Sequence, residues 1–290
     1  MTSKQKAIWL MVISTLSMSI MQLFVKLTSG RIPTMEQVFV RNLVTLFVGA
    51  FLLIKRGTPA LGHKGNRLAL FARSLLGYLG VVGYFYATRH MNVADASLLH
   101  RSSPFFVIIF SALFLKNRLK WVQLAALILA FTGSVLVINP SFNVDVVPAL
   151  IGLGSAAGAG GAYTVINHLK GKESNETIIF CFSLFSCVFS LLFVGDFVVP
   201  TGRELLLLLG IGVFAGIGQI ALTQAYKMTE PGSVSIINYS GILFSAVFGF
   251  AFLDEVLETR SILGILAIFT AALLLYFVKD SREIGKKKTA

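Results

Sequence analysis

Long apolar segments separated by short polar joints recur from one end of the chain to the other. A run of about 20 apolar residues is long enough to cross the hydrocarbon core of a bilayer as a helix. The segments lack the period-two alternation of transmembrane β-strands, so they predict an all-α membrane protein. The ten predicted transmembrane helices cover residues 6–27, 36–54, 68–88, 94–115, 121–138, 147–167, 177–194, 204–226, 232–253 and 259–278.

Composition also indicates extensive contact with lipid. Hydrophobic residues make up 56% of the 290 positions, charged residues make up 13%, and the mean hydropathy is +0.81. Soluble domains average about 45–50% apolar and about 25% charged residues. The first apolar segment follows Lys4 and Lys6, as in a signal peptide, but it is longer and has no clear small-residue cleavage site. We therefore expect this segment to be retained.

The basic residues are distributed unevenly between alternate joints. With the N-terminus placed inside, the inner joints and the C-terminal tail carry roughly three times as many Lys and Arg residues as the outer joints. The positive-inside rule thus predicts a multi-pass protein of the inner (plasma) membrane with both termini in the cytoplasm. The net charge of +12 reflects this orientation. Because the basic residues are scattered over short joints, they do not indicate a nucleic-acid partner.

The two halves of the chain repeat one pattern. A shift of 138 positions aligns IFSALFLKNRL of the fourth segment with VFGFAFLDEVL of the ninth without a gap, and a shift of 141 positions aligns the second segment with the seventh. We expect two five-helix repeats, residues 1–140 and 141–290. An odd number of helices per repeat inserts the second repeat upside down relative to the first. Inverted repeats are typical of secondary transporters with a central site and alternating access.

Several segments carry a family resemblance. The joints in LFLKNRLKWVQLAALILAFTGSVLV and AFLDEVLETRSILGILAIFTAALLL, together with FVRNLV, ARSLLGYLGVVGYFYATRHMNVADASLL and SSPFF, resemble the drug/metabolite transporter superfamily of the EamA type, in its S-adenosylmethionine-transporter-like and organic-anion branch. The resemblance implies a central cavity lined mainly by helices 1, 3, 4, 6, 8 and 9. Members usually carry a small polar residue before the SPxF element, where this chain has His100 and Arg101.

Charged residues inside the predicted helices are few, and the acidic residues lie only at the helix ends or in the joints. No carboxylate lies at mid-bilayer depth, which argues against a cation/proton antiporter. Arg41, Arg73 and Arg101 do lie within helices, and each costs about 2.5–3.5 kcal/mol at a helix centre. Arg101 is nearest the middle of a cavity-lining helix, so we interpret it as a ligand-binding residue. For Arg41 and Arg73, snorkelling to the headgroups or pairing with backbone carbonyls remains an alternative to ligand binding.

The repeat adds a second polar position opposite Arg101. Under the shift of 138, His100 and Arg101 fall on Asn238 and Tyr239, and both pairs interrupt apolar segments at the same depth. Pro104 removes a backbone donor and frees a carbonyl group near His100. Two polar pairs related by an inverted repeat near the midplane are what a carrier's binding site requires.

Further candidates come from the other helices that the resemblance places around the cavity. Gln22 belongs to a polar stripe at helical spacing, and an amide in lipid, as at Gln22 or Gln219, would remain unsatisfied. No Cys/His cluster has metal-ligand spacing and no nucleotide-binding loop occurs, so we predict no metal, cofactor or catalytic residue. The candidate substrate-binding residues are Arg101, His100, Asn238, Tyr239, Gln219, Gln22, Tyr163, Arg73 and Arg41.

These features predict a secondary active transporter of a small organic metabolite that bears a carboxylate or another anionic group. Arg101 would bind the negative group, and His100 could supply coupling to protons. The alternative is an exporter of amino acids or of zwitterionic metabolites such as S-adenosylmethionine. A membrane-embedded enzyme, a scaffold or a channel fits the dispersed histidines and the inverted repeats less well. The expected partners are the lipid bilayer and the solute, and a homodimer remains open.

Overall fold

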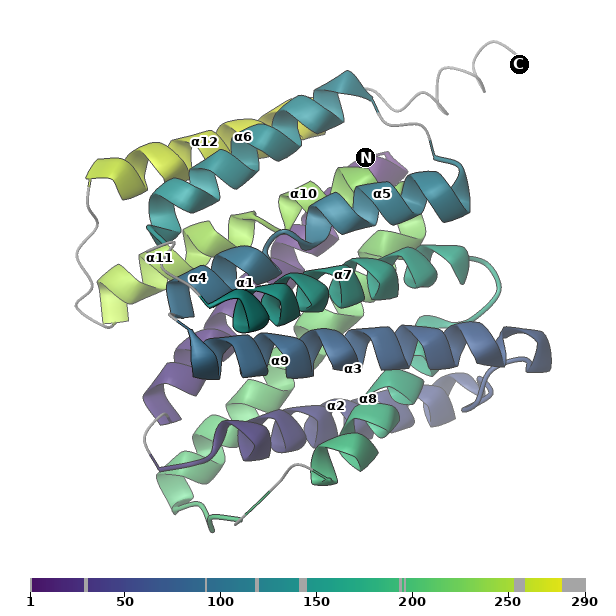
Figure 1. The fold of residues 1–290 in the computed structure, drawn as a ribbon. Coiled ribbons are helices and arrows are strands. Elements are labelled where there is room, and N and C mark those ends of the chain that lie inside the picture. The colour runs from purple at the N-terminus through teal and green to yellow at the C-terminus, as the bar shows by residue number, and fades with distance from the viewer. Residues whose placement is uncertain are drawn as a thin grey trace, which may run out of the picture.

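The computed structural model describes residues 2–28, 31–91, 93–117, 120–140, 145–192, 195, 197–252 and 259–277. The acidic joint 254–258 and the basic tail 278–290 lie outside the described residues. The chain forms one helical bundle (Figure 1). Its helices are α1 Ser3–Thr28, α2 Thr34–Arg56, η1 Lys64–Asn66, α3 Arg67–His90, α4 Val93–His100, α5 Ser103–Leu115, α6 Trp121–Ile138, α7 Val146–His168, α8 Asn175–Leu191, α9 Gly202–Met228, α10 Pro231–Ile237, α11 Ser240–Phe252 and α12 Thr259–Phe277.

The ten predicted segments are all helical, and the predicted bounds agree with the observed ones to within a few residues. In the described part of the chain, nine helical segments have the length and hydropathy needed to cross a membrane, and α8 is a shorter apolar helix of 17 residues. The protein is therefore a multi-pass membrane protein. Two segments differ from the prediction of continuous helices, because the fourth consists of α4 and α5 and the ninth of α10 and α11.

The packing follows the inverted repeat. α1 packs against α9, and the equivalent helices of the other half, α7 and α3, pack in the same way. α6 packs against α12 at one edge of the bundle, and α2 packs against α8 at the opposite edge (Figure 1). Each of these two pairs joins equivalent helices, one from each repeat. The bundle thus consists of two inverted five-helix repeats, and the most extensive helix contacts join a helix of one repeat to a helix of the other.

Matching close contacts support the repeat at the level of single residues. A Cβ atom added to Gly80 of α3 would lie 3.1 Å from the carbonyl oxygen of Ser155. A Cβ atom added to Gly218 of α9 would lie 3.2 Å from the carbonyl oxygen of Ser14. The two glycines are 138 positions apart and the two serines are 141 positions apart, which are the shifts found in the sequence. Glycine is needed at both places because the helix backbones approach closely.

Pro104 lies at the start of α5, directly after the break in the fourth segment. Its ring has no N–H group, so it cannot donate to the carbonyl group of His100 and continue the α-helical ladder. The backbone instead tightens, with the Ser102 N–H donating to the Leu99 carbonyl oxygen at 3.0 Å. Arg101 and Ser102 form the turn between the two half-helices.

The ninth segment breaks at the equivalent place without a proline. The N–H groups of Asn238 and Tyr239 donate to the carbonyl oxygens of Ser235 and Ile236, both at 3.2 Å, in the tighter three-residue pattern. Asn238 and Tyr239 form the turn before α11. Both repeats therefore carry a discontinuous helix at the same position, as in many transporters.

A cluster of hydrogen bonds around Glu173, which we call the clasp, joins the joint between α7 and α8 to the joint between α2 and α3. Glu173, in the joint between α7 and α8, accepts hydrogen bonds from the His63 backbone N–H at 2.7 Å and from Asn66 Nδ2 at 2.8 Å. Its Oε1 atom also lies 3.1 Å from His63 Nδ1. Burial alone would raise the pKa of Glu173, but these hydrogen bonds outweigh it and lower the pKa. The clasp therefore favours the ionised carboxylate.

Candidate substrate-binding site

Arg101 extends from the break in the fourth segment towards the break in the ninth. One terminal nitrogen of its guanidinium group, Nη1, lies 3.8 Å from the place that a Cβ atom at Gly241 would occupy. That place is also 3.5 Å from Thr15 Cβ and 3.8 Å from Ser19 Oγ. Arg101 therefore lies where the two breaks and α1 meet. Its side chain is half-buried.

The surroundings of Arg101 favour a negative charge. Among the described residues, no carboxylate forms a salt bridge with Arg101. The hydroxyl groups of Tyr84 and Tyr239 are close enough to interact with it electrostatically. The half-helices α5 and α11 both begin next to the breaks, and the N-terminal ends of helices carry partial positive charge. The arrangement is suited to an anionic group of a ligand.

His100 is held beside this position by polar and aromatic contacts. Its Nδ1 atom lies 3.0 Å from Ser155 Oγ of α7, and its ring lies 4.8 Å from the ring of Tyr84. The Tyr84 hydroxyl group in turn lies 3.0 Å from Ser97 Oγ of α4. Ser155 was not among the sequence candidates. Ser14, which aligns with Ser155 under the shift of 141 positions, donates a hydrogen bond to the Gly218 carbonyl oxygen at 2.8 Å. The alignment of the two repeats could therefore have identified Ser155.

Two of the remaining candidates near the ninth segment lie close to the break. Tyr239 is 1% exposed, and its buried hydroxyl group has no hydrogen-bond partner within the described part of the chain. Asn238 is half-buried. Tyr239 is thus brought together with Arg101, as the alignment of the repeats predicts. An unsatisfied buried hydroxyl group is costly, which suits a residue that meets a ligand.

The two glutamine candidates make contacts within the protein. Gln219 is buried, and its Nε2 atom donates to Thr223 Oγ1, one turn further along α9, at 3.3 Å. Gln22 is exposed and accepts a hydrogen bond from Ser245 of α11 at 3.2 Å. The polar stripe on α1 also includes Thr15, whose Oγ1 atom lies 2.9 Å from Ser240 Oγ of α11. The stripe therefore helps to attach α1 to the second half of the ninth segment.

The last three candidates are Arg41, Arg73 and Tyr163. Both guanidinium groups are close enough to interact electrostatically with the Tyr163 hydroxyl group. Arg73 is only 2% exposed, so it does not reach the headgroups and snorkelling does not apply to it. Some of the candidate residues therefore lie at the helix breaks, and others lie near Tyr163.

The sequence profile of the EamA-like transporter family matches residues 5–139 and again residues 147–277. The chain belongs to the EamA-like transporter family. Two matches, one in each half, are what a chain built from two copies of the same unit gives.

Three curated relatives of this EamA-like chain have the names of transport proteins. The pseudopaline exporter CntI of Pseudomonas aeruginosa is 36% identical over 275 residues, which cover 93% of this chain and 96% of that protein. The solute carrier family 35 member G1 of Mus musculus is 27% identical and covers 89% of this chain and 74% of its own length. The S-adenosylmethionine uptake transporter of Rickettsia bellii is 24% identical over 74% of each chain.

A crystal structure of another protein shares this fold. It superposes with a TM-score of 0.81 over 92% of this chain and 95% of that chain, at 18% sequence identity. At this identity the match shows a common fold. The closely matching coverage of both chains means that the whole ten-segment bundle is shared.

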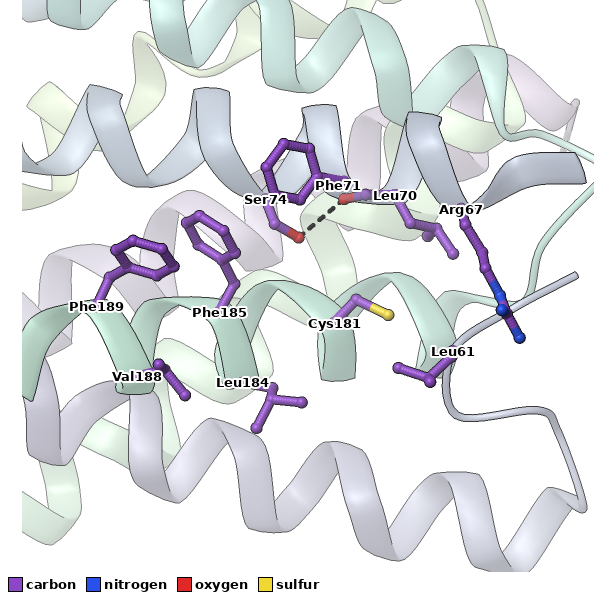
Figure 2. A pocket seen from close by; sticks show the side chains of 10 residues that line it. All are labelled: Leu61, Arg67, Leu70, Phe71, Ser74, Cys181, Leu184, Phe185, Val188 and Phe189. Carbon is purple, nitrogen blue, oxygen red and sulfur yellow. Dashed lines mark hydrogen bonds between the residues drawn. The ribbon is translucent and has the colours of Figure 1, made fainter. Parts of the chain in front are cut away.

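One groove of the EamA-like bundle is lined by none of the nine candidate substrate-binding residues. It has a volume of about 320 Å³ and lies between α3 and α8, as Figure 2 shows. Apart from Arg67, Ser74 and Cys181 its lining is apolar, and the Ser74 hydroxyl group already donates to the Leu70 carbonyl oxygen at 2.9 Å. The groove is suited to hydrocarbon and offers little to a polar solute.

Proposed function

We propose that this chain is a secondary active transporter of the inner membrane that carries a small organic metabolite bearing a carboxylate group. In this proposal both termini face the cytoplasm. The observation that carries the proposal is Arg101, whose guanidinium group pairs with no carboxylate of the described residues and lies at the meeting point of two broken helices. Guanidinium groups bind carboxylates through paired, charge-assisted hydrogen bonds. Arg101 would hold the carboxylate, and Tyr239 and Asn238 would contact the rest of the solute.

Alternating access follows from the way the repeats pack. The close pairs α1 with α9 and α3 with α7 each join one helix from each repeat. Rocking of one repeat against the other would change these contacts and leave the breaks near the pivot. Arg101 would then face the cytoplasm in one state and the opposite side in the other. The solute bound to it would cross the membrane without a continuous pore.

The alternative solutes are amino acids and zwitterions. The relatives named above support a metabolite as cargo, since one is named for pseudopaline export and another for S-adenosylmethionine uptake. A zwitterion would still place its carboxylate on Arg101, while aromatic rings such as Tyr84 could meet its cationic part. Competition of labelled citrate against a labelled amino acid would separate the two classes.

The direct test is transport by purified protein in liposomes with the variant Arg101→Ala. We expect it to abolish transport while the protein remains folded, because the carboxylate loses its charged partner. Arg67→Ala is the matched control, since Arg67 lies exposed at the apolar groove. Unchanged transport by Arg101→Ala, with the control also active, would defeat the assignment of the site.

We further propose that His100 couples transport to protons. It is a titratable side chain that lies next to Arg101 in the chain and is hydrogen-bonded to α7, so its protonation would be sensed by both repeats. His100→Gln retains a hydrogen-bonding side chain but cannot titrate. We expect this variant to exchange solute across the liposome membrane and to lose the response to a pH gradient. A response equal to that of the wild type would exclude His100 as the coupling residue.

A further inference from the structure

The groove between α3 and α8 faces the lipid. Phe71 of α3 and Val188 and Phe189 of α8 line it, and all three side chains are exposed (Figure 2). Exposed apolar side chains on membrane-spanning helices contact the hydrocarbon of the bilayer. α3 belongs to the first repeat and α8 to the second. The groove is therefore a lipid-facing recess whose two walls come from different repeats.

The polar groups that line the groove are bonded within the protein, except at one end. The Ser74 hydroxyl group donates to the Leu70 carbonyl oxygen at 2.9 Å, and Cys181 Sγ donates to the Ala60 carbonyl oxygen at 3.3 Å. Arg67, the first residue of α3, is exposed and forms no salt bridge or hydrogen bond with the described residues. The groove therefore offers a ligand an apolar wall and one cation.

The length of the groove matches one leaflet of a bilayer. Along α8 the lining extends over eight positions, from Cys181 to Phe189, which corresponds to about 12 Å. The hydrocarbon of one leaflet is about 15 Å deep, half of the whole core. Arg67 lies at the same end of the groove as Leu61, which belongs to the joint between α2 and α3 (Figure 2). The groove thus begins at the depth of the headgroups and continues into the hydrocarbon.

The charges around Arg67 favour an anionic headgroup. Lys64, three positions earlier in η1, is also exposed. The carboxylates near the start of α8 are already bonded, since Glu173 belongs to the clasp and Glu176 lies 2.8 Å from Arg56. Basic residues at a membrane surface attract anionic lipids. A lipid phosphate at Arg67 would therefore meet positive charge.

The equivalent helix pair of the inverted repeat, α9 and α2, is packed more closely at the corresponding place. Ser74 corresponds to Gly212 under the shift of 138, and Phe185 corresponds to Val44 under the shift of 141. A Cβ atom at Gly212 would overlap Val44, so these smaller residues allow α9 and α2 to approach. Between α3 and α8, the Phe185 ring instead packs edge-on against the Phe71 ring at 5.7 Å between ring centres. The bulkier side chains hold α3 and α8 apart and create the groove.

We infer that this groove binds an anionic phospholipid, with an acyl chain between α3 and α8 and the phosphate group at Arg67. The inference goes beyond the proposed function and takes from it only the orientation, which places the joint between α2 and α3 in the cytoplasm. The position equivalent to Arg67 in the other repeat is Leu205, which carries no charge. The lipid would therefore come from the cytoplasmic leaflet, whose surface is negatively charged. Once bound, it would bridge the two repeats and stabilise the bundle.

The test is a titration of the purified chain in detergent with dioleoyl phosphatidylglycerol, read as the melting temperature. Phosphatidylcholine with the same acyl chains is the second arm, and glycerol phosphate, which has the charge but no acyl chain, is the third. We expect phosphatidylglycerol to raise the melting temperature of the wild type most, as a ligand of the folded state does. Phosphatidylcholine should raise it less, and glycerol phosphate should leave it unchanged.

Two variants separate the charge from the apolar wall. Arg67→Gln should shift the midpoint of the phosphatidylglycerol response about fivefold, which is the contribution of one basic residue near a membrane surface. Val188→Trp fills the groove from its exposed wall and should weaken the response to both lipids. The matched controls are Arg203→Gln and Val213→Trp, at exposed positions of α9, and both should respond as the wild type does.

Four results would overturn the inference. The first is an equal response of the wild type to the two lipids, or an unaltered phosphatidylglycerol midpoint in Arg67→Gln. The second is an unaltered lipid response in Val188→Trp, which would place the acyl chain elsewhere. The third is an equal response to glycerol phosphate, which would indicate a site for a free anion. The fourth is a wild-type dimer that Val188→Trp dissociates, which would assign the groove to a second copy of the chain.

The lipid assay and the transport assay fail independently. None of the candidate substrate-binding residues lines the groove, so the lipid response does not depend on Arg101. Failure of the proposed function appears as unchanged transport by Arg101→Ala, with the lipid responses intact. Failure of the lipid site appears as one of the four results above, with transport by Arg101→Ala still abolished.

Discussion

The contact between α3 and α7 allows a quantitative prediction with two glycines of one helix. A Cβ atom at Gly158 would lie 2.9 Å from the Leu76 carbonyl oxygen and 3.1 Å from the Gly80 nitrogen, whereas a Cβ atom at Gly154 meets nothing within 4 Å. Alanine in a helix interior gains about 0.8–1.0 kcal/mol over glycine. Overpacking against backbone costs about 1–3 kcal/mol. Gly154→Ala should therefore stabilise the protein, and Gly158→Ala should be less stable than Gly154→Ala by about 1–3 kcal/mol.

The assay compares the two variants and the wild type by unfolding in the same detergent. Because Gly158, unlike Gly154, lies at the contact between α3 and α7, Gly158→Ala should also slow transport in liposomes, while Gly154→Ala should leave it unchanged. Equal stability of the two alanine variants would refute the close approach of α3 and α7. Normal transport by a destabilised Gly158→Ala would refute the role of this contact in alternating access.

Other predictions concern the loops and the helix ends. Glu173→Gln should lower the melting temperature at pH 7, because the variant lacks the ionised carboxylate. The folded-state pKa of Glu173 lies below 4.5, so the stability that the ionised carboxylate contributes is complete above pH 4.5. The difference in melting temperature from the wild type should shrink as the pH falls through the folded-state pKa. Asn167→Ala should cost about 1–3 kcal/mol in denaturant unfolding, since its Nδ2 atom donates to the carbonyl oxygens of Tyr226 at 2.6 Å and Thr229 at 2.9 Å. Thr15→Val should destabilise the protein less, because Ser19 still bonds to α11 at 2.9 Å.

Much of the fold was predictable because lipid imposes a simple rule on sequence. A spanning helix must satisfy its own backbone and present apolar side chains, so hydropathy alone locates the segments. The alignment of the two repeats could also be predicted. The shifts that align the two halves of the sequence also relate the residues in the close contacts of Gly80 and Gly218. The break in the fourth segment was indicated by Pro104, although the segment was predicted as one helix. The break before α11 has no proline and could be inferred only by symmetry.

The candidate site was predictable in part. Arg101 and Tyr239 were identified because their positions correspond under the repeat, and the structure brings them together. The placement of both Arg41 and Arg73 near Tyr163 depends on how the helices pack, which hydropathy does not encode. Phe182 under the Arg73 guanidinium group was missed for the same reason, since one phenylalanine among many in lipid-spanning helices carries no signal of its own.

The most direct test of the account is whether the turn that contains Arg101 is reached by water from both sides of the membrane. A single cysteine, Ser102→Cys, would be placed in a chain whose only two cysteines are replaced, and treated with a membrane-impermeant thiol reagent from each side. Leu113→Cys on the exposed face of α5 is the control that should remain unreactive in lipid. The account predicts labelling of Ser102→Cys from both sides, slowed by a transported carboxylate. Absence of labelling from both sides, or labelling that the solute leaves unchanged, would contradict it.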